Sequence, residues 1–377
     1  MVFVLCVAFA IAFMNGSNDV SKGIATLVGS GVTNYKKAIL WGTLWTGTGG
    51  LAGAYLAGAM LDTFGKGLLQ PGTVPSFAAA LATILGATLW VAFASKTGLP
   101  VSTTHAIVGS LIGVAAIAYG PAAVVWHSLQ TKIALPLLLS PILALVLMFL
   151  IARTARLFGA FSETASDCVC VETQPVARGV AVGAGLAADG VQAFPNTALR
   201  VETGSIESCA VERPGRTRVT LDHLHWLTSA GTSFARGLND APKMVAIVLA
   251  AAALAGGKAN LKLSAFAIVT LGMVIGSLVG GRRVTQVLAE KVTRMNHRDG
   301  FLANLLTTLL VGSGAAFGLP MSTTHVSSGA IFGIGAEARD GRVHWNVVRQ
   351  IVGAWVITLP CAALLGVLAY LLLHRVV

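Results

Sequence analysis

Two short polar motifs, each present twice within apolar sequence, constrain the fold of this chain more than any other feature. The segment 13–22 (FMNGSNDVSK) is echoed by 234–243 (FARGLNDAPK), and 98–105 (GLPVSTTH) is echoed by 318–325 (GLPMSTTH). The offset from Asp19 to Asp240 is nearly the same as the offset from Ser102 to Ser322. Such a constant offset indicates an internal duplication, so we expect two similar halves that carry the same polar cluster.

The composition indicates a membrane protein. Hydrophobic residues make up 55% of the 377 residues and charged residues only 11%, with a mean hydropathy of +0.77. In soluble domains, about a quarter of the residues are charged. Several apolar stretches approach or exceed the ~20 residues that span a bilayer. They are 1–28, 38–61, 75–95, 106–119, 133–152, 243–255, 263–281, 301–317, 326–336 and 351–373.

We therefore predict an all-α polytopic membrane protein built from two repeats with broken helices and re-entrant hairpins. The first repeat covers 1–152 and the second covers 223–377. An odd number of crossings in each repeat, whether three or five, inverts the second relative to the first. A linker module over 153–222 joins them.

The net charge of +11 reflects topology rather than nucleic-acid binding. Basic residues gather in short loops that this topology places on one side, such as Lys36 and Lys37 and the segment 282–299. The positive-inside rule then places both termini outside and the central loop in the cytoplasm, which fits a multi-pass protein of the cytoplasmic (inner) membrane. Apolar residues at helical spacing within 282–299 predict an interfacial helix on the inner leaflet.

The linker 153–222 is predicted to be a small β-rich cytoplasmic module, because apolar and polar residues alternate over 167–172 and 199–203. Cys168, Cys170 and Cys209 could bind a metal, helped by His223 or His225. Their spacing is not the usual one for zinc, so small buried strand residues are the favoured interpretation.

The Asn-Asp motifs carry ionisable groups into apolar sequence. A charge in the bilayer costs roughly 2.5–3.5 kcal/mol on insertion scales, so Asp19 and Asp240 are functional candidates by default. Gly16 and Gly237 are expected to let each helix unwind and expose carbonyl oxygens. The carboxylates and neighbouring asparagines are hard oxygen donors suited to Na⁺ or a proton. The alternative is a purely structural pairing of each aspartate with the lysine three residues later.

The Gly-Leu-Pro-x-Ser-Thr-Thr-His motifs predict a loop that opens into a helix. Glycine and proline end the preceding segment, and a hydroxyl residue can cap the apolar helix that follows. A helix N-terminus offers unpaired N–H groups to an anion. Two such ends from inverted repeats could meet at one point, with His105 and His325 as proton carriers or as hydrogen-bond partners of the helix ends.

With these four motifs in this order, the chain resembles the inorganic phosphate transporter (PiT) family over nearly its whole length except 160–220. The resemblance implies inverted repeats with re-entrant hairpins, a central site, alternating access, a homodimer embedded in membrane lipid, and no cofactor beyond co-transported H⁺ or Na⁺. It implies that the cation sites, including sodium at Asp19 and Asp240, use the Asn-Asp pairs, and that the hydroxyl clusters bind phosphate. The implied cation-site residues are Asn18, Asp19, Asn239 and Asp240, and the implied phosphate-site residues are Ser102, Thr103, Thr104, Ser322, Thr323 and Thr324.

The chain departs from this pattern at Lys22 and Lys243, where sodium-coupled members of the family often have asparagine. A lysine ammonium could replace a bound Na⁺ and compensate the carboxylates. If Arg236 also faces inward, two aspartates and three basic groups leave one positive charge, which H₂PO₄⁻ would neutralise. We therefore favour proton-coupled symport, or transport of a protonated or metal-paired phosphate, over obligatory coupling to two sodium ions.

Three other functions compete with phosphate transport. A sulfate or other oxyanion permease could use the same scaffold, but phosphate can donate protons to carboxylates and sulfate at neutral pH cannot. A membrane-embedded enzyme could use Asp19 and Asp240 as an acid/base dyad, but no nucleophile or metal triad accompanies them. An anion channel would gain nothing from fixed carboxylates beside its pathway. We expect a transporter rather than an enzyme.

Overall fold

The computed structural model describes residues 2–66, 68–158, 168–176, 196–204, 216–254, 261–338 and 343–376. The chain divides into two compact units. The larger unit comprises Met1–Thr154 and His225–Val377, and the smaller comprises Ala155–Leu224.

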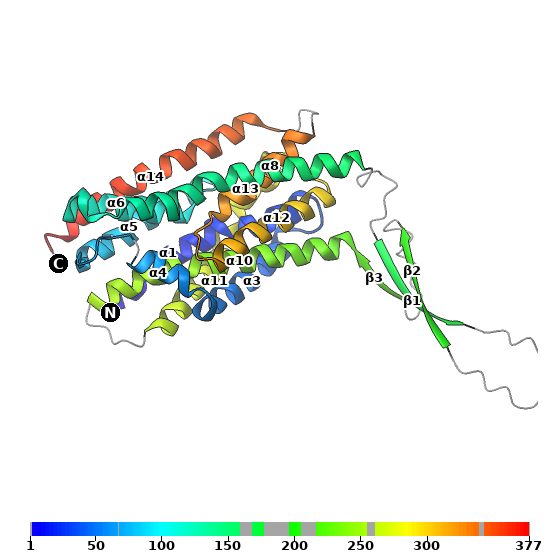
Figure 1. Ribbon diagram of the computed structural model, residues 1–377, viewed down its shortest axis with the longest axis horizontal. Coiled ribbons are helices and arrows are strands. Elements are labelled where there is room, and N and C mark those ends of the chain that lie inside the picture. The colour runs from blue at the N-terminus through cyan, green and yellow to red at the C-terminus, as the bar shows by residue number, and fades with distance from the viewer. Residues whose placement is uncertain are drawn as a thin grey trace, which may run out of the picture. The chain divides into compact units, whose positions relative to one another are not determined.

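The described elements of the larger unit are helices, apart from one isolated β-bridge between Leu69 and Val124 (Figure 1). Its helices are α1 (Val2–Asp19), α2 (Ser21–Gly29), α3 (Tyr35–Leu56), α4 (Gly58–Lys66), α5 (Phe77–Thr97), α6 (Thr103–Tyr119), α7 (Trp126–Ser128), α8 (Leu135–Leu157), α10 (Leu221–Leu254), α11 (Lys262–Gln286), α12 (His297–Ala316), α13 (Thr323–Glu337) and α14 (Trp345–Leu373). Short 3₁₀ and π-helical turns connect some of them, over Pro121–Ala123, Leu129–Ala134 and Val287–Lys291.

Six of the described helical stretches are long and apolar enough to cross a membrane. They are Val2–Gly29, Phe77–Thr97, Trp126–Leu157, Leu221–Leu254, Lys262–Lys291 and Trp345–Leu373. The structure therefore confirms the prediction of a helical, multi-pass membrane protein.

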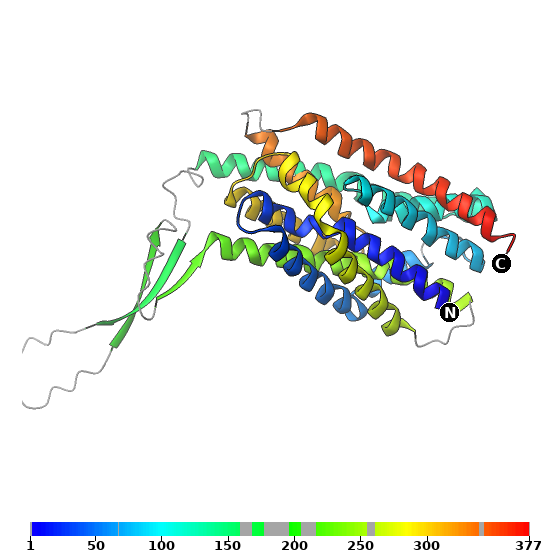
Figure 2. The ribbon, with the colours of Figure 1, turned by 180° about the vertical axis from the view of Figure 1, so that it is seen from behind.

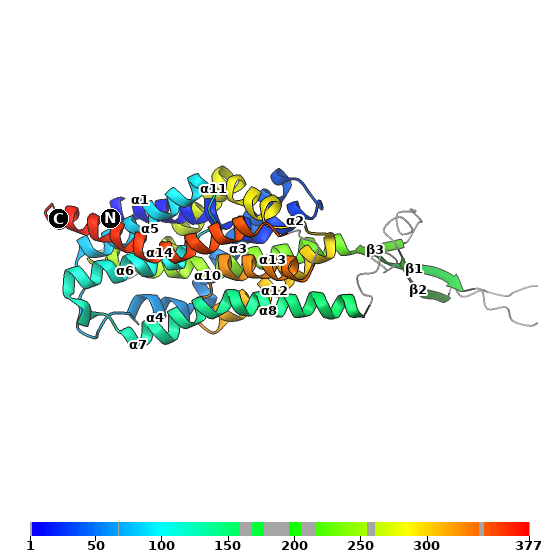
Figure 3. The same cartoon turned by 90° about the horizontal axis from the view of Figure 1, so that it is seen from above.

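Two helical hairpins enter the larger unit from opposite ends. The α5–α6 hairpin opens toward the end where both termini lie, and the α12–α13 hairpin opens toward the other end (Figure 1). Helix α14 packs along both α5 and α6 (Figure 3). The two hairpin tips are the Gly-Leu-Pro-x-Ser segments, so the chain brings its two repeated hydroxyl motifs inside the bundle.

Helices α1 and α11 touch backbone to backbone through glycines (Figure 2). A Cβ added to Gly16 would lie 2.1 Å from Met273 O, and one added to Gly276 would lie 1.9 Å from Phe13 O. Only glycine permits this approach. The predicted unwinding at Gly16 is wrong, because this residue lies inside α1 and serves close packing.

Helices α3 and α10 repeat this arrangement with the second motif. A Cβ on Gly237 would lie 2.3 Å from Thr46 O, and one on Gly49 would lie 2.1 Å from Phe234 O. Gly237 also lies inside a continuous helix, α10, so the unwinding predicted there is wrong for the same reason. Both motif glycines hold the motif helix against a neighbour.

The predicted interfacial helix over 282–299 is wrong as well. The segment contains the end of α11, the turn Val287–Lys291, a loop and the start of α12. Its apolar residues Val284, Leu288 and Val292 are buried, and Leu288 and Val292 belong to a core cluster with Ile331 of α13. Apolar residues at helical spacing here mark contact with protein rather than with a leaflet surface.

The smaller unit contains a three-stranded antiparallel sheet of β1 (Cys168–Val176), β2 (Asn196–Gly204) and β3 (Arg216–Thr220), in the order β2-β1-β3. Strand β1 contains residues 168–172 of the first segment whose alternation predicted a strand, and β2 contains all of the second, 199–203. Cys168 and Cys170 are buried on one face of β1, whereas Cys209 lies outside the described residues. Within the described ranges, no three His, Cys, Asp or Glu side chains are grouped to hold a metal.

Candidate functional site

Each hairpin tip has the turn and cap that its sequence predicts. Gly98 and Gly318 have φ of 80° and 68°, the left-handed region in which glycine ends a helix without strain. The side chain of Ser102 then caps α6 by accepting a 3.3 Å hydrogen bond from the backbone N–H of His105. The side chain of Ser322 caps α13 in the same way, accepting from the backbone N–H of His325 at 3.2 Å. Both motifs therefore place a helix N-terminus at the tip of a hairpin.

The two tips meet inside the bundle. Thr324 Oγ1 donates a 2.8 Å hydrogen bond to Val101 O of the opposite tip. The rings of His105 and His325 pack with centroids 4.5 Å apart. The sequence-based expectation that two helix N-termini approach one point is confirmed by these contacts.

The first Asn-Asp motif holds its own lysine. Lys22 Nζ donates to Asp19 Oδ1 at 2.8 Å, to Asn18 Oδ1 at 2.8 Å and to Asn18 O at 2.7 Å. All three side chains are buried. Asn18 Nδ2 also donates to Leu99 O at 3.0 Å, which ties the motif to the first hairpin tip.

The second motif holds its lysine with help from both hairpins. Lys243 Nζ donates to Asp240 Oδ1 at 3.2 Å, to Thr104 Oγ1 at 2.8 Å and to Met321 O at 3.2 Å. Asn239 Nδ2 donates to Asp240 Oδ1 at 2.9 Å and to Met321 O at 2.8 Å. Both aspartate–lysine pairs of the structural alternative therefore form, and each is embedded in contacts with a hairpin.

Asn15 joins the two motifs, although sequence reasoning did not select it. Its Nδ2 lies 2.8 Å from Asp19 Oδ2, 3.2 Å from Asp240 Oδ2 and 3.1 Å from Thr103 Oγ1. Thr103 Oγ1 in turn donates to Asp19 Oδ2 at 3.1 Å. The available signal was spacing, because Asn15 stands one helical turn before Asp19 and hence on the same face.

Arg236 is the third basic group of the site, and it is fully buried. Its Nη2 donates to Thr46 Oγ1 at 2.9 Å, and its Nη1 lies 3.5 Å from Asn15 Oδ1. The Asn15 side chain thus links the guanidinium to the carboxylates of Asp19 and Asp240. Arg236 therefore faces the polar cluster, which is the condition under which the charge count leaves one positive charge.

The structure brings all twelve predicted site residues into one buried region, but in different roles. Ser102 and Ser322 act as caps, while Thr103 and Thr104 contact the aspartate–lysine clusters. Thr323 Oγ1 and Asn239 Oδ1 are buried without a hydrogen-bond partner among the described residues. These two atoms are therefore available to a polar substrate.

The motif histidines border a second, apolar space. His105 and His325 line an apolar cavity of about 690 Å³ between α6, α8, α13 and α14. The Trp355 ring lies 4.1 Å from His325, and its Nε1 donates to Pro100 O at 3.1 Å. Both roles considered for these histidines, proton carrier and hydrogen-bond partner of the helix ends, stay predictions.

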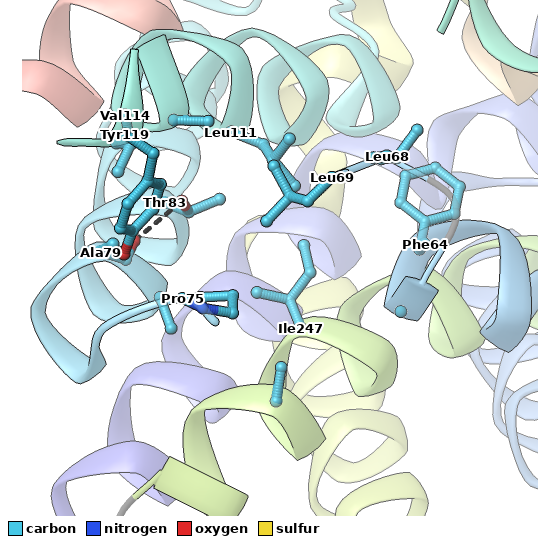
Figure 4. Close-up of a pocket in the computed structure, with 14 residues that line it drawn as sticks. Phe64, Leu68, Leu69, Pro75, Ala79, Thr83, Leu111, Val114, Tyr119 and Ile247 are labelled. Atoms are coloured by element: carbon cyan, nitrogen blue, oxygen red, sulfur yellow. Dashed lines mark hydrogen bonds between the residues drawn. The ribbon is translucent and has the colours of Figure 1, made fainter. Parts of the chain in front are cut away.

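A smaller cavity of about 60 Å³ lies among α4, α5, α6 and α10 (Figure 4). Its labelled side chains include two hydroxyls, Thr83 and Tyr119, and no charged group. An anion would lose its hydration there without replacement. The polar cluster at the hairpin tips is therefore the better candidate site.

Comparisons with known proteins agree with this geometry. The model of the Phosphate transporter family matches residues 15–366. The chain is 28% identical over 385 residues to a probable low-affinity inorganic phosphate transporter of Bacillus subtilis, covering 100% of this chain and 97% of the relative. It is 28% identical over 420 residues to inorganic phosphate transporter 2-1, chloroplastic, of Arabidopsis thaliana, covering 97% and 70%.

A solved structure shares the fold. It is described as the sodium-dependent phosphate transporter, and it superposes with a TM-score of 0.77 at 20% identity, over 100% of this chain and 99% of that one. The family match extends through both Asn-Asp motifs and both hairpin tips. The chain therefore belongs to the phosphate transporter family and is a multi-pass membrane transporter rather than an enzyme.

Proposed function

We propose that this protein carries inorganic phosphate across the cytoplasmic membrane by alternating access, with coupling to protons rather than sodium. The observation that carries the coupling proposal is the position of the two lysines. Each ammonium donates to three oxygens, which satisfies all three of its N–H groups. Carboxylate, carbonyl and hydroxyl or amide oxygens are also the donors that Na⁺ prefers. The lysines thus stand in for cations at Asp19 and Asp240.

The substrate proposal follows from the groups left around these clusters. Hydroxyls of Thr103, Thr104 and Thr323 come from two helix N-termini, which favour an anion. Asp19 and Asp240 lie beside them and can accept protons from a protonated phosphate. Sulfate has no proton to donate at neutral pH, so phosphate fits this mixture of donors and acceptors better.

An inverted-repeat architecture, with repeats over 1–152 and 223–377, is supported by matched helix contacts. Gly16 and Gly237 are equivalent positions of the two Asn-Asp motifs, and each approaches a backbone carbonyl of the other repeat. The partners, Met273 and Thr46, are separated along the chain by nearly the same offset as the glycines. Exchanging the repeats exchanges one contact for the other, as a two-fold relation requires.

The hairpin contacts follow the same rule. A Cβ on Gly109 of α6 would lie 2.4 Å from Leu359 O, and one on Gly329 of α13 would lie 2.5 Å from Pro141 O. These glycines occupy equivalent positions after the two hydroxyl motifs, and each again packs on a helix of the other repeat. We propose that both hairpins are re-entrant. We also propose that alternating access occurs by rocking of the two matched repeats against each other. External termini, a cytoplasmic 153–222 module and a homodimer complete the proposal.

The test is radiolabelled phosphate uptake into proteoliposomes under an imposed H⁺ or Na⁺ gradient, with excess sulfate as competitor. Uptake driven by H⁺ alone and unaffected by sulfate is expected. Strict sodium dependence without a response to pH would refute the coupling proposal. Sulfate competition would favour the oxyanion permease instead.

A paired variant tests the role of the lysines directly. Replacing Lys22 and Lys243 by asparagine removes both ammoniums and leaves the oxygens around them. We expect uptake by this double variant to become stimulated by Na⁺. Lys36→Asn, which changes an exposed lysine, is the matched control and should leave the ion dependence unchanged. A double variant that folds but gains no response to Na⁺ would contradict the idea that the lysines replace cations.

A further inference from the structure

The apolar cavity of about 690 Å³ beside the hairpin tips has no part in the proposed transport. Helices α6 and α8 enclose it together with α13 and α14. Its polar lining side chains are His105, His325 and Trp355, and the other lining residues are apolar. The indole N–H of Trp355 is already bonded to Pro100 O. The space is therefore suited to an apolar occupant rather than to an ion.

Neither water nor empty space accounts for the interior of this cavity. Apolar cavities stay dry, because a buried water needs several polar partners. An empty cavity destabilises a protein in proportion to its volume, and at 690 Å³ the loss would exceed the whole stability of a typical domain. The occupant must therefore be an apolar molecule.

The cavity opens toward the membrane between α8 and α14. Four of its apolar lining side chains are exposed, namely Leu138 and Ile142 on α8 and Val352 and Val356 on α14. Both helices belong to stretches that are long and apolar enough to cross a bilayer. Exposed apolar side chains on such helices face lipid tails, which are as apolar as leucine. The bilayer can therefore supply the occupant sideways.

The length of the cavity fits one acyl chain. On α14 its lining runs from Val348 to Leu359, which is roughly 17 Å at about 1.5 Å per residue. One leaflet contributes about half of the ~30 Å hydrocarbon core. Helix α14 begins close by at Trp345, an exposed tryptophan of the kind found at membrane interfaces. A chain that enters there passes Val348 and reaches Trp355, whose ring lies against His325 of a hairpin tip.

A basic side chain stands at this mouth. Arg349 is exposed and lies on the same face of α14 as Val352 and Val356, one and two turns before them. Its guanidinium donates to the side chain of Asn346, and no carboxylate among the described residues pairs with it. A guanidinium presents paired donors that match a phosphate group. The mouth therefore favours a phospholipid over a plain hydrocarbon.

We propose that this cavity holds one acyl chain of a membrane phospholipid, whose phosphate is bound by Arg349. The site is separate from the polar cluster and does not depend on the transported ion. The chain packs on α6 and α13 together, and these helices begin at the two hairpin tips. Binding is therefore linked to the arrangement in which the tips touch, and it stabilises that arrangement.

Native mass spectrometry of the full-length protein, reconstituted with phosphatidylglycerol and then released into detergent, measures the retained lipid. One phospholipid per chain is expected to stay bound. A tryptophan at position 352 narrows the mouth, so Val352→Trp should lower the retained lipid about tenfold. Ile357→Trp is the matched control, because Ile357 is similarly exposed on α14 but does not line the cavity.

Two further measurements locate the head and the tail of the lipid. Arg349→Gln should weaken retention about fivefold, the effect of one basic residue at a membrane surface. Arg375→Gln, beyond the other end of α14, is its control. A phosphatidylglycerol with a photoreactive diazirine at the end of its acyl chain should crosslink to Leu137 and Leu359, deep in the cavity.

Equal retention of lipid by Val352→Trp and Ile357→Trp would overturn the site, as would crosslinks confined to residues outside the cavity. A bound mass equal to a free fatty acid would overturn the assignment to a phospholipid. Protein that stays dimeric without lipid would assign the exposed faces of α8 and α14 to a second copy of the chain instead. None of these results depends on phosphate uptake, so a failure of the proposed function is seen separately in the uptake assay.

Discussion

The first and second Asn-Asp motifs share their asparagine, aspartate and lysine but connect them differently. Lys22 takes all three of its oxygens from Asn18 and Asp19 of its own motif. Lys243 takes one from Asp240 and two from the hairpin tips. The comparison teaches that duplication preserves these three residues and not their contacts. The first ammonium is held within its own motif, whereas the second depends on both hairpin tips for two of its three contacts.

The largest effect is expected from removing a carboxylate. Asp19→Asn and Asp240→Asn each leave a buried lysine without its counter-ion and add a net positive charge to the site. We expect phosphate uptake to fall at least a hundredfold in each. Uptake in proteoliposomes measures the loss, and size-exclusion behaviour in detergent checks that the variants insert and fold. Wild-type rates in both variants would remove the carboxylates from the mechanism.

Replacing either motif glycine by alanine should disrupt the helix contact of that motif, and we expect the two losses of stability to be equal. Gly16→Ala and Gly237→Ala each drive a methyl group to within 2.3 Å or less of a backbone oxygen, so the helices must separate. We expect each change to lower the free energy of unfolding by about 1–3 kcal/mol. Thermal unfolding measures it, with Gly353→Ala as the control because no atom lies within 4 Å of its added Cβ. A large difference between the two repeats would argue against their equivalence.

The smallest effect is expected from the threonines of the two hairpins, and it tests the difference between their hydrogen bonds. Thr104 accepts a hydrogen bond from the Lys243 ammonium, whereas its counterpart Thr324 donates to the neutral carbonyl of Val101. Hydrogen bonds to charged groups contribute about 1.5–3 kcal/mol and neutral ones about 0.5–1.5. We therefore expect Thr104→Val to reduce uptake about tenfold or more and Thr324→Val about threefold. Equal losses would mean that the lysine contact does not contribute.

Much of the site could be predicted from the sequence because its determinants are local. The caps at Ser102 and Ser322, the left-handed glycines before them and the aspartate–lysine pairs depend on residues within five positions of each other. Because each motif occurs twice, the sequence also identified the two helices whose N-termini meet. Helical class followed from composition, since few charged residues interrupt long apolar stretches.

The rest depended on contacts between distant segments. Asn15 lies between the two carboxylates only because α1 and α10 approach each other. Gly16 and Gly237 suggest flexible points in the sequence, and only their neighbours on α11 and α3 show that they serve packing. The segment 282–299 has the spacing of a surface helix, but its apolar side meets protein.

Trp355 touches both hairpins, and this gives the protein an internal optical probe. Its indole N–H donates a hydrogen bond to Pro100 O of one tip, and its ring packs against the His325 ring of the other. Any separation of the tips must break one of these contacts and change the polarity around the indole. Once the other six of the seven tryptophans are replaced, emission from Trp355 would follow the two tips in real time, without an attached label.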